Sequence, residues 1–346
     1  MFNTLKKTSL ALLVASTAFI SLSCNKDDPE ADKLGNWYRT GIPNFGGSAR
    51  ARAVSFVIGN KGYIGTGLTN ETVQRVKDFW SYDATTKIWS QVAPFEGSGR
   101  NDAVAFVLSG KAYVGTGFDG VTTVDGGYKK DFYQYDPTSN SWTQKADFAG
   151  TGRYAAVGFQ AGGKAYFGTG YDGNYLKDFY QYNDQTNTWT LVNGFSGNKR
   201  RNATAFVIAN KVYLGTGINN GVYQEDFWEF DPATDVWTRK RDIDKDTDDD
   251  YTYNDEYAIV RSNASSFTMN GLGYIVGGEN VKTTWEYNPS TDLWVERTPM
   301  EGASRTDAVG FAINNRGFYM LGRVGSTYFD DAWEFKPLDE QSDDDN

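Results

Sequence analysis

Six arginines recur along the chain, each just before a short apolar run. The intervals between successive arginines are 50, 53, 47, 61 and 44 residues. A guanidinium group binds carboxylates bidentately through its planar set of N–H donors, so a ring of such residues could hold an acidic ligand. Together with Arg52, which lies two residues after the first of them, the candidate ligand-binding residues are Arg50, Arg52, Arg100, Arg153, Arg200, Arg261 and Arg305.

An aspartate recurs almost as regularly, directly before an aromatic segment. Each aspartate could pair with an arginine as a structural ion pair, and repetition in every unit is typical of a scaffold. For most of the ring the sequence favours this structural interpretation. Arg50 and Arg52 are the preferred ligand contacts, because only the first repeat carries a second arginine two residues later. The recurring aspartates are Asp78, Asp131, Asp178, Asp226 and Asp331.

The repeat that carries these residues is clearest from Arg100 to Trp142. An apolar run, Ala103–Leu108, is followed by a Ser-Gly turn and a second apolar run, Lys111–Val114. A third segment ends at Asp136-Pro137, where proline favours a turn, and the fourth contains Trp142 among polar residues. Four short strands in about 50 residues, with burial falling from the first to the fourth, indicate a propeller blade.

The tryptophans predict how the ring closes. The sixth repeat ends at Trp333-Glu334-Phe335 with no fourth strand after it, whereas Trp37 precedes the first arginine. We therefore predict that the strand around Trp37 completes the last blade, which leaves no open sheet edge. The expected fold is an all-β, six-bladed propeller over residues 34–337, followed by an acidic tail over residues 338–346.

These repeats resemble those of the kelch family and are similar to the central domain of galactose oxidase. The shared features are the arginine before the first strand, the apolar-Tyr-x-Gly strand at Ala112–Gly115, the turn at Tyr135-Asp136-Pro137, and Trp142. The kelch Gly-Gly doublet occurs only as Gly277-Gly278. Kelch proteins that bind acidic peptides contact them through arginines at these positions, so the resemblance implies a binding role for the arginine ring.

The composition excludes several kinds of site. The chain has no histidine and one cysteine, which excludes histidine-based catalysis, Cys-His metal sites and internal disulfides. Copper chemistry of the galactose oxidase type would need histidine ligands and is excluded as well. A net charge of −10 without a basic run argues against nucleic-acid binding. The run Asp242–Asp250 lacks the glycine and glutamate of an EF-hand, so a solvated loop is favoured over a calcium site. We expect no metal and no cofactor.

The N-terminus has the pattern of an export signal. Lys6 and Lys7 precede the apolar run Leu10–Leu22, which is too short to span a membrane. Ser21–Cys24 resembles a bacterial lipobox, although an ordinary signal peptide with an incidental cysteine is the alternative. We predict a lipoprotein signal peptide over residues 1–23, lipidation of Cys24 and a tether over residues 24–33. The Lys26-Asp27-Asp28 run resembles the export signal of surface lipoproteins in some Gram-negative bacteria, which implies a lipid-anchored, surface-exposed position on the outer membrane.

Strand order indicates which face could act. The connections after the second and fourth strands of each blade share the face that carries the arginines, and the former vary in length. Variable loops on a fixed scaffold are the usual place for a site. We expect a non-catalytic module that binds a glycan or a protein there. The alternatives are a metal-free sugar mutarotase or epimerase, using an arginine with Glu96, Glu279 or Glu301, and a purely structural surface protein.

Overall fold

The computed structural model describes residues 33–70, 74–121, 125–244 and 257–342. Residues from Lys33 onward form one compact unit. The predictions for the signal peptide, for Cys24 and for the calcium or solvated loop beyond Asp244 lie outside the described residues. Among the described residues, no helix has both the length and the apolar character needed to cross a membrane.

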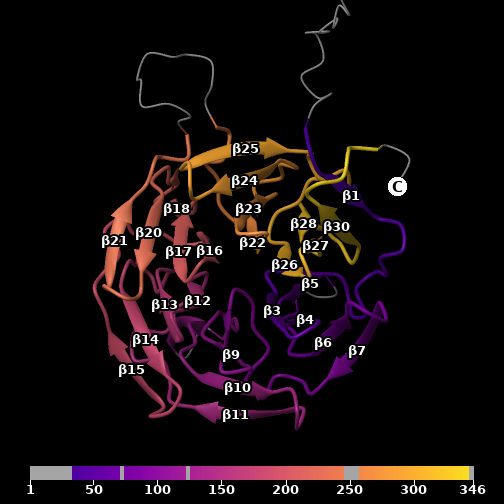
Figure 1. Cartoon of the computed structure of the whole chain (residues 1–346). Helices are drawn as coiled ribbons and strands as arrows, with labels where there is room; N and C mark the ends of the chain where they lie inside the picture. The colour runs from indigo at the N-terminus through magenta and orange to yellow at the C-terminus, as the bar shows by residue number, and fades with distance from the viewer. Residues whose placement is uncertain (1–32, 71–73, 122–124, 245–256, 343–346) are drawn as a thin grey trace, which may run out of the picture. The chain divides into compact units, whose positions relative to one another are not determined.

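Six four-stranded antiparallel sheets follow one another along the chain, and each is one blade (Figure 1). Blades 1 to 3 are β3 (Val54–Ile58), β4 (Lys61–Gly65), β6 (Phe79–Asp83) and β7 (Ile88–Val92); β8 (Val104–Leu108), β9 (Lys111–Gly115), β10 (Phe132–Asp136) and β11 (Ser141–Lys145); and β12 (Val157–Ala161), β13 (Lys164–Gly168), β14 (Phe179–Asn183) and β15 (Thr188–Leu191). Blades 4 to 6 are β16 (Thr204–Ile208), β17 (Lys211–Gly215), β20 (Trp228–Asp231) and β21 (Val236–Arg239); β22 (Ser265–Met269), β23 (Leu272–Val276), β24 (Thr284–Asn288) and β25 (Leu293–Arg297); and β26 (Val309–Ile313), β27 (Arg316–Met320), β30 (Ala332–Lys336) and β1 (Asn36–Tyr38).

The ring is closed by its first and last strands, as predicted. β1 pairs antiparallel with β30, and Trp37 lies opposite Phe335. The Trp37 side chain is fully buried, and its indole N–H donates to the carbonyl of Thr298 at 3.0 Å. The innermost strands also contact one another in sequence, with β26 returning to β3. The six-bladed, all-β fold and its closure around Trp37 are therefore confirmed.

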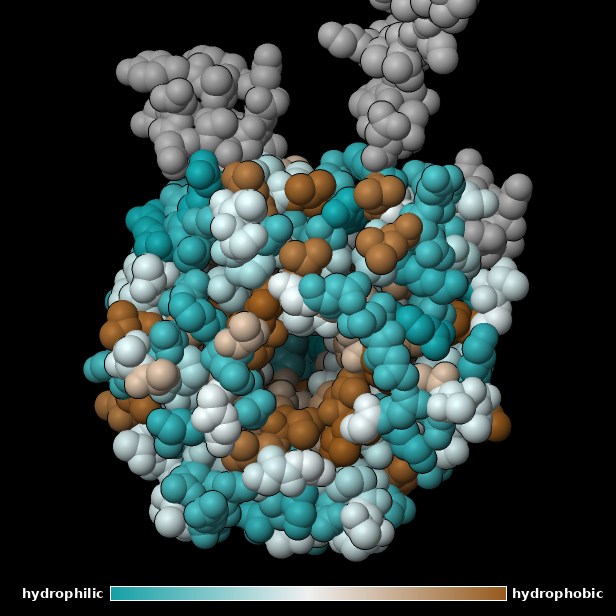
Figure 2. Space-filling model, in the orientation of Figure 1, coloured by the Kyte–Doolittle hydropathy of each residue, from teal (hydrophilic) through white to brown (hydrophobic). Residues whose placement is uncertain are grey.

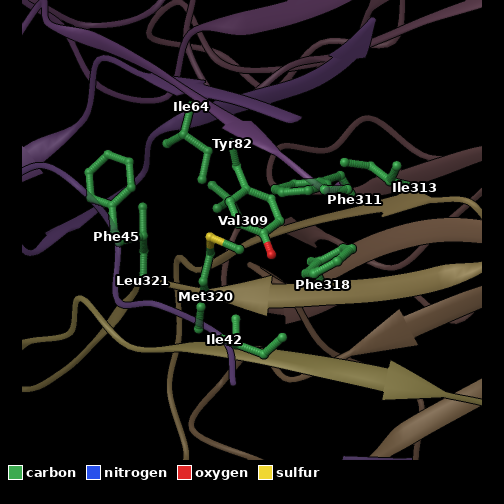
Figure 3. Packing of buried hydrophobic residues seen from close by; sticks show 12 residues of the cluster. Ile42, Phe45, Ile64, Tyr82, Val309, Phe311, Ile313, Phe318, Met320 and Leu321 are labelled. Atoms are coloured by element: carbon green, nitrogen blue, oxygen red, sulfur yellow. The ribbon is translucent and has the colours of Figure 1, made fainter. Parts of the chain in front are cut away.

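Apolar side chains fill the space between neighbouring blades. Figure 3 shows one such layer, in which Val309 and Met320 of blade 6 lie against Ile64 and Tyr82 of blade 1. Each innermost strand alternates buried and half-buried residues, with one side of the strand in such a layer. Because every blade packs against two others, the core is continuous around the ring.

The glycine that ends the second strand in blades 1 to 4 has a steric cause. A Cβ atom on Gly115 would lie 2.1 Å from the ring of Phe132, the first residue of the third strand. The equivalent atom on Gly65 would lie 2.2 Å from the ring of Phe79. The aromatic ring thus lies directly over the glycine backbone, which only a residue without a side chain allows.

The connections divide the propeller into two faces. The segments that enter each first strand and the loops between second and third strands share one face, here called the loop face. In blade 1 the loop strand β5 (Leu68–Thr69) pairs with β2 (Arg50–Ala51) of the entering segment. The loops of blades 4 and 6 form two-stranded ribbons of their own, β18 (Ile218–Asn219) with β19 (Val222–Tyr223) and β28 (Arg323–Val324) with β29 (Thr327–Tyr328). A short 3-10 turn, η1 (Asp125–Gly127), lies in the loop of blade 2. The hollow at the centre of the ring is visible in Figure 2.

Candidate functional site

The repeated arginines are buried partners of the repeated aspartates. Arg100 is fully buried, and its two terminal nitrogens donate to the two carboxylate oxygens of Asp131 at 2.6 and 2.7 Å. The same side chain donates to the carbonyls of Thr116 and Ser98 at 2.9 and 3.0 Å. Its guanidinium also lies 4.8 Å from the centre of the Phe95 ring. Each nitrogen of the guanidinium therefore donates to an acceptor within the blade.

This arrangement recurs in five blades. In each, the arginine side chain is no more than 1% exposed. It lies between the entering loop and the end of the second strand and contacts both. These arginines are buried within their blades, so the prediction that they contact a ligand at the channel mouth is wrong for these five. The pairs are Arg50–Asp78, Arg100–Asp131, Arg153–Asp178, Arg200–Asp226 and Arg305–Asp331.

Arg261 of blade 5 is buried without a carboxylate. Thr283 occupies the place of the aspartate, and Arg261 donates instead to the carbonyls of Ile259, Gly277 and Ala258. Burial without a facing acid lowers the pKa of Arg261 to about 10. Its side chain is only slightly exposed, so it too is a scaffold residue rather than a contact at the channel mouth.

Arg52 alone among the predicted residues faces the channel. Its Nε and Nη1 atoms lie 3.1 and 3.2 Å from the carboxylates of Asp307 and Asp102, which belong to the two neighbouring blades. Asp102 is the main reason that the pKa of Arg52 is raised, whereas burial raises the pKa of the Asp102 carboxyl. The Arg52 side chain remains 29% exposed. Arg52 is therefore held by two acids, yet it stays accessible from the channel.

The channel mouth is built by one backbone position from each blade. All six of these residues have positive φ, between 52° and 59°. The amide of Arg52 donates to the carbonyl of Asp307 at 2.9 Å, and the amide of Asp102 donates to the carbonyl of Arg52 at 3.0 Å. These bonds link neighbouring blades around a cavity of about 190 Å³. The residues at this position are Arg52, Asp102, Ala155, Asn202, Asn263 and Asp307.

A cluster of aromatic residues lies beside this mouth on blades 2 and 3, and we call it the tyrosine patch. Ring centres of neighbouring members lie 5.0 to 6.4 Å apart, and Tyr128 stacks on Tyr154 with an angle of 19° between the rings. Every member is half-buried. Backbone bridges fix the loops that carry them, since Tyr171 pairs with both Tyr154 and Tyr175. The members are Phe118, Tyr128, Tyr154, Tyr171 and Tyr175.

Two arginines lie against the tyrosine patch. The guanidinium of Arg75 lies 4.7 Å from the centre of the Phe118 ring. Arg201 lies 5.2 Å from the centre of the Tyr171 ring and 5.6 Å from those of Tyr154 and Tyr175, and it donates to the Tyr154 hydroxyl. Neither arginine was a predicted site residue, and the patch was not expected from the sequence. The available signal was Arg200-Arg201, the only repeat in which the ring arginine is followed directly by another arginine.

A pocket between blades 2 and 3 adjoins the tyrosine patch through Tyr128. It encloses about 700 Å³, and two smaller pockets of about 350 and 260 Å³ lie against the loops of blades 1 and 4. Its wall includes Lys130, Asp172 and Tyr180, and Asp172 accepts a hydrogen bond from the Thr151 hydroxyl at 2.7 Å. Aromatic faces and hydroxyl-binding groups therefore occur together in this pocket.

Of the three glutamates predicted as candidates for acid–base catalysis, Glu279 lies at the channel mouth. Glu279 accepts hydrogen bonds from Ser262 and from Asn263, which is a channel-mouth residue. Glu96 is exposed on a turn, and the backbone carbonyl of Glu301 accepts from Lys282. In the part of the chain that the structure describes, no group of three or more acidic, cysteine or histidine residues could hold a metal ion.

Comparisons with known proteins address the fold. No family model and no curated protein matches the sequence. Among solved structures, that of YjhT matches with a TM-score of 0.69 at 16% sequence identity, covering 84% of this chain and 95% of that chain. At this identity the likeness concerns the fold alone. Together with the six sheets described above, it places this chain among the six-bladed β-propellers.

Proposed function

We propose that this protein is a kelch-type binding module that takes a glycan on its loop face, with the tyrosine patch as the contact surface. The observation that carries the proposal is that the patch departs from the repeat. At the position of Tyr154 the other blades have Ala51, Asn101, Arg201, Ser262 and Thr306. Phe118 and Tyr171 stand where blades 1 and 4 have the apolar Leu68 and Ile218, but no other blade has an aromatic residue at the position of Tyr154.

The chemistry of the tyrosine patch suits a sugar. A pyranose presents apolar C–H faces and polar hydroxyls, and a tyrosine presents an apolar ring with a hydroxyl at its tip. Ligand sites typically combine aromatic walls with a few polar groups. The patch supplies half-buried rings, and the adjoining pocket supplies Lys130 and Asp172 for hydroxyl groups. An oligosaccharide could cover both.

The proposal includes the location of the protein. A lipid on Cys24, followed by a short polar tether, would hold the propeller at the outer membrane surface with its ligand site exposed to the surroundings. The lipobox-like Ser21–Cys24 and the Lys26-Asp27-Asp28 run support this part. Metabolic lipid labelling of the wild type and of Cys24→Ser tests it, because label on the wild type alone is the expected result.

A glycan array followed by titration calorimetry tests the binding function. The chain from Lys33 onward forms a compact unit and is suitable material. Tyr128→Ala removes the ring that joins the tyrosine patch to the pocket and should abolish binding. Tyr223→Ala is the matched control, because Tyr223 is exposed in the loop of blade 4 outside the patch. Equal binding by both variants would contradict the proposed surface.

One observation favours a second function, a metal-free sugar mutarotase or epimerase. Burial raises the pKa of Asp102 beside the channel cavity, and Arg52 and Glu279 lie at the same mouth. A carboxyl group with a raised pKa is suited to proton transfer. Exchange of sugar anomers followed by NMR tests this function, since Asp102→Asn should remove any acceleration. Tight binding without acceleration would exclude this function for the sugar bound.

A further inference from the structure

The arginines of the loop face differ in whether a carboxylate faces them. Five ring arginines hold an aspartate, Arg52 holds two, and Arg323 and Arg239 hold Asp307 and Asp242 at 3.0 and 2.7 Å. Arg75 and Arg201, the two arginines of the tyrosine patch, have no carboxylate within 4.0 Å among the described residues. Burial lowers the pKa of Arg75, and Asp119 and Asp102 oppose this only from beyond that distance. Neither guanidinium of the patch is therefore held in an ion pair.

Arg75 is fixed in place but keeps donors for a ligand. Its Nε atom donates to the side-chain oxygen of Asn101 at 2.7 Å, and the guanidinium plane lies against Phe118. Neither terminal nitrogen has a hydrogen-bond partner among the described residues. A Cβ atom on Gly120 would lie 2.4 Å from one of these nitrogens, so a glycine at this position leaves room for the guanidinium itself.

Arg201 is held in the same manner at the other end of the tyrosine patch. One terminal nitrogen donates to the Tyr154 hydroxyl, and the guanidinium is surrounded by three tyrosine rings. Its Nε atom is buried without a partner among the described residues. Stacking on aromatic rings holds a guanidinium in one orientation, and a preorganised guanidinium loses less entropy when it binds an anion.

We infer that the tyrosine patch recognises an acidic saccharide, whose carboxylate or sulfate groups are bound by Arg75 and Arg201 while its sugar rings lie on the aromatic residues. This inference rests on the proposed function and names its ligand class. Charge complementarity is the reason for choosing an acidic saccharide over a neutral one, because two fixed guanidinium groups without a carboxylate partner bind an anion best. Both anions fit the guanidinium fork, so the experiment separates them.

The backbone of the tyrosine patch favours a saccharide over an acidic peptide. Phe118 and Asn101 exchange both backbone hydrogen bonds at 2.9 and 3.0 Å, and Tyr171 and Tyr154 do so at 3.0 and 3.1 Å. A peptide that adds to a sheet needs free backbone donors and acceptors. Those of Phe118, Tyr154 and Tyr171 are used in these bridges, which leaves ring faces, hydroxyls and guanidinium groups as the means of recognition there.

Titration with four probes tests the ligand class. The probes are an oligogalacturonate, a sulfated carrageenan oligosaccharide, cellohexaose as the neutral saccharide, and poly-glutamate as the acidic peptide. We expect one of the acidic saccharides to bind at least tenfold more tightly than cellohexaose. The affinity should fall with increasing salt, because exposed charges are screened. Which of the two binds identifies the anion.

Arg75→Gln and Arg201→Gln should each weaken binding of the acidic saccharide about ten- to hundredfold, which corresponds to the loss of a charge-assisted hydrogen bond. Arg239→Gln is the control. It removes the same charge from the outer strand of blade 4, where the Arg239 side chain is 56% exposed. A thermal melt of each variant shows whether the propeller is intact, and Arg201→Lys, which keeps the charge, gives a second variant if Arg201→Gln does not fold.

The outcomes separate the inference from the proposed function. Equal affinity for cellohexaose and the acidic saccharides overturns the inference and leaves a neutral glycan module. Tight binding of poly-glutamate alone overturns both. If Arg239→Gln weakens binding as much as Arg75→Gln, the effect comes from the net charge of the face, and the assignment to Arg75 and Arg201 is wrong.

Discussion

The arginine–aspartate ring and the tyrosine patch both lie on the loop face, and they use arginine in opposite ways. In the ring, Arg100 is fully buried and its charge is matched by Asp131. In the patch, Arg201 is half-buried, lies against tyrosine rings and has no carboxylate partner among the described residues. The arginine–aspartate pair recurs in five blades, whereas the patch occurs once. The repeated arginines therefore fix the entering loop within each blade, whereas the two arginines of the patch are available to a ligand.

Blade 5 shows what the aspartate contributes. Arg261 makes the same type of carbonyl contact as Arg100, with Gly277 in the place of Thr116, but has Thr283 where Arg100 has Asp131. The carbonyl contacts thus persist without the ion pair. We conclude that the arginine links the entering loop to the second strand, and that the aspartate compensates the buried charge.

The largest expected effect follows from removing that compensation. Asp131→Ala leaves Arg100 buried and unpaired, which should lower the free energy of unfolding by about 3 kcal/mol. Urea unfolding at pH 7 measures the change. Thr283→Ala in blade 5 is the matched variant and should cost under about 1 kcal/mol, because no charge is uncovered. Equal losses in the two variants would mean that the ion pair has no special role.

Acid should weaken the ring in the same way. Although burial alone raises the pKa values of Asp78, Asp226 and Asp331, their arginine partners hold them below the ordinary value of 3.8. A carboxyl group with a depressed pKa in the folded state contributes stability that is present above its unfolded pKa and is lost as the pH falls through the folded one. Stability should therefore change little between pH 7 and 5 and fall below pH 4. Urea midpoints across this range test the expectation, and a fall that is complete above pH 5 would contradict it.

Thr283→Asp would give blade 5 the pair that the other blades have. The new carboxylate should raise the pKa of Arg261 from about 10 and increase the free energy of unfolding by about 1 kcal/mol. The gain is smaller than the loss expected for Asp131→Ala, because the carbonyl of Ala258 already accepts from Arg261. A loss of stability would show that blade 5 has adapted its backbone to the threonine.

The fold could be predicted from the sequence because the arginine, the apolar runs and the tryptophan recur from blade to blade. The aspartates follow their arginines by 25 to 31 residues, so pairing was a foreseeable alternative to ligand binding. The tyrosine patch could not be predicted in this way. Phe118 and Tyr154 belong to different blades, and only the packing of two irregular loops brings their rings to 6.0 Å. Arg52 also depends on the closed ring, since its partner Asp307 is 255 residues away.

The smallest expected effect on stability belongs to the tyrosine patch. Tyr175 is half-buried, and its ring lies 5.0 Å from that of Tyr171 and 5.6 Å from the Arg201 guanidinium. Tyr175→Ala removes no buried charge and no repeated contact, so it should cost under about 1 kcal/mol of unfolding free energy. The same change takes away an exposed ring face and one wall around Arg201, and glycan affinity should fall about fivefold or more, a loss of about 1 kcal/mol. Tyr175→Phe keeps the ring and should retain most of that affinity. If Tyr175→Ala destabilises the propeller as much as Asp131→Ala does, or binds glycan as the wild type does, the distinction between a repeated scaffold and a single ligand surface fails at this residue.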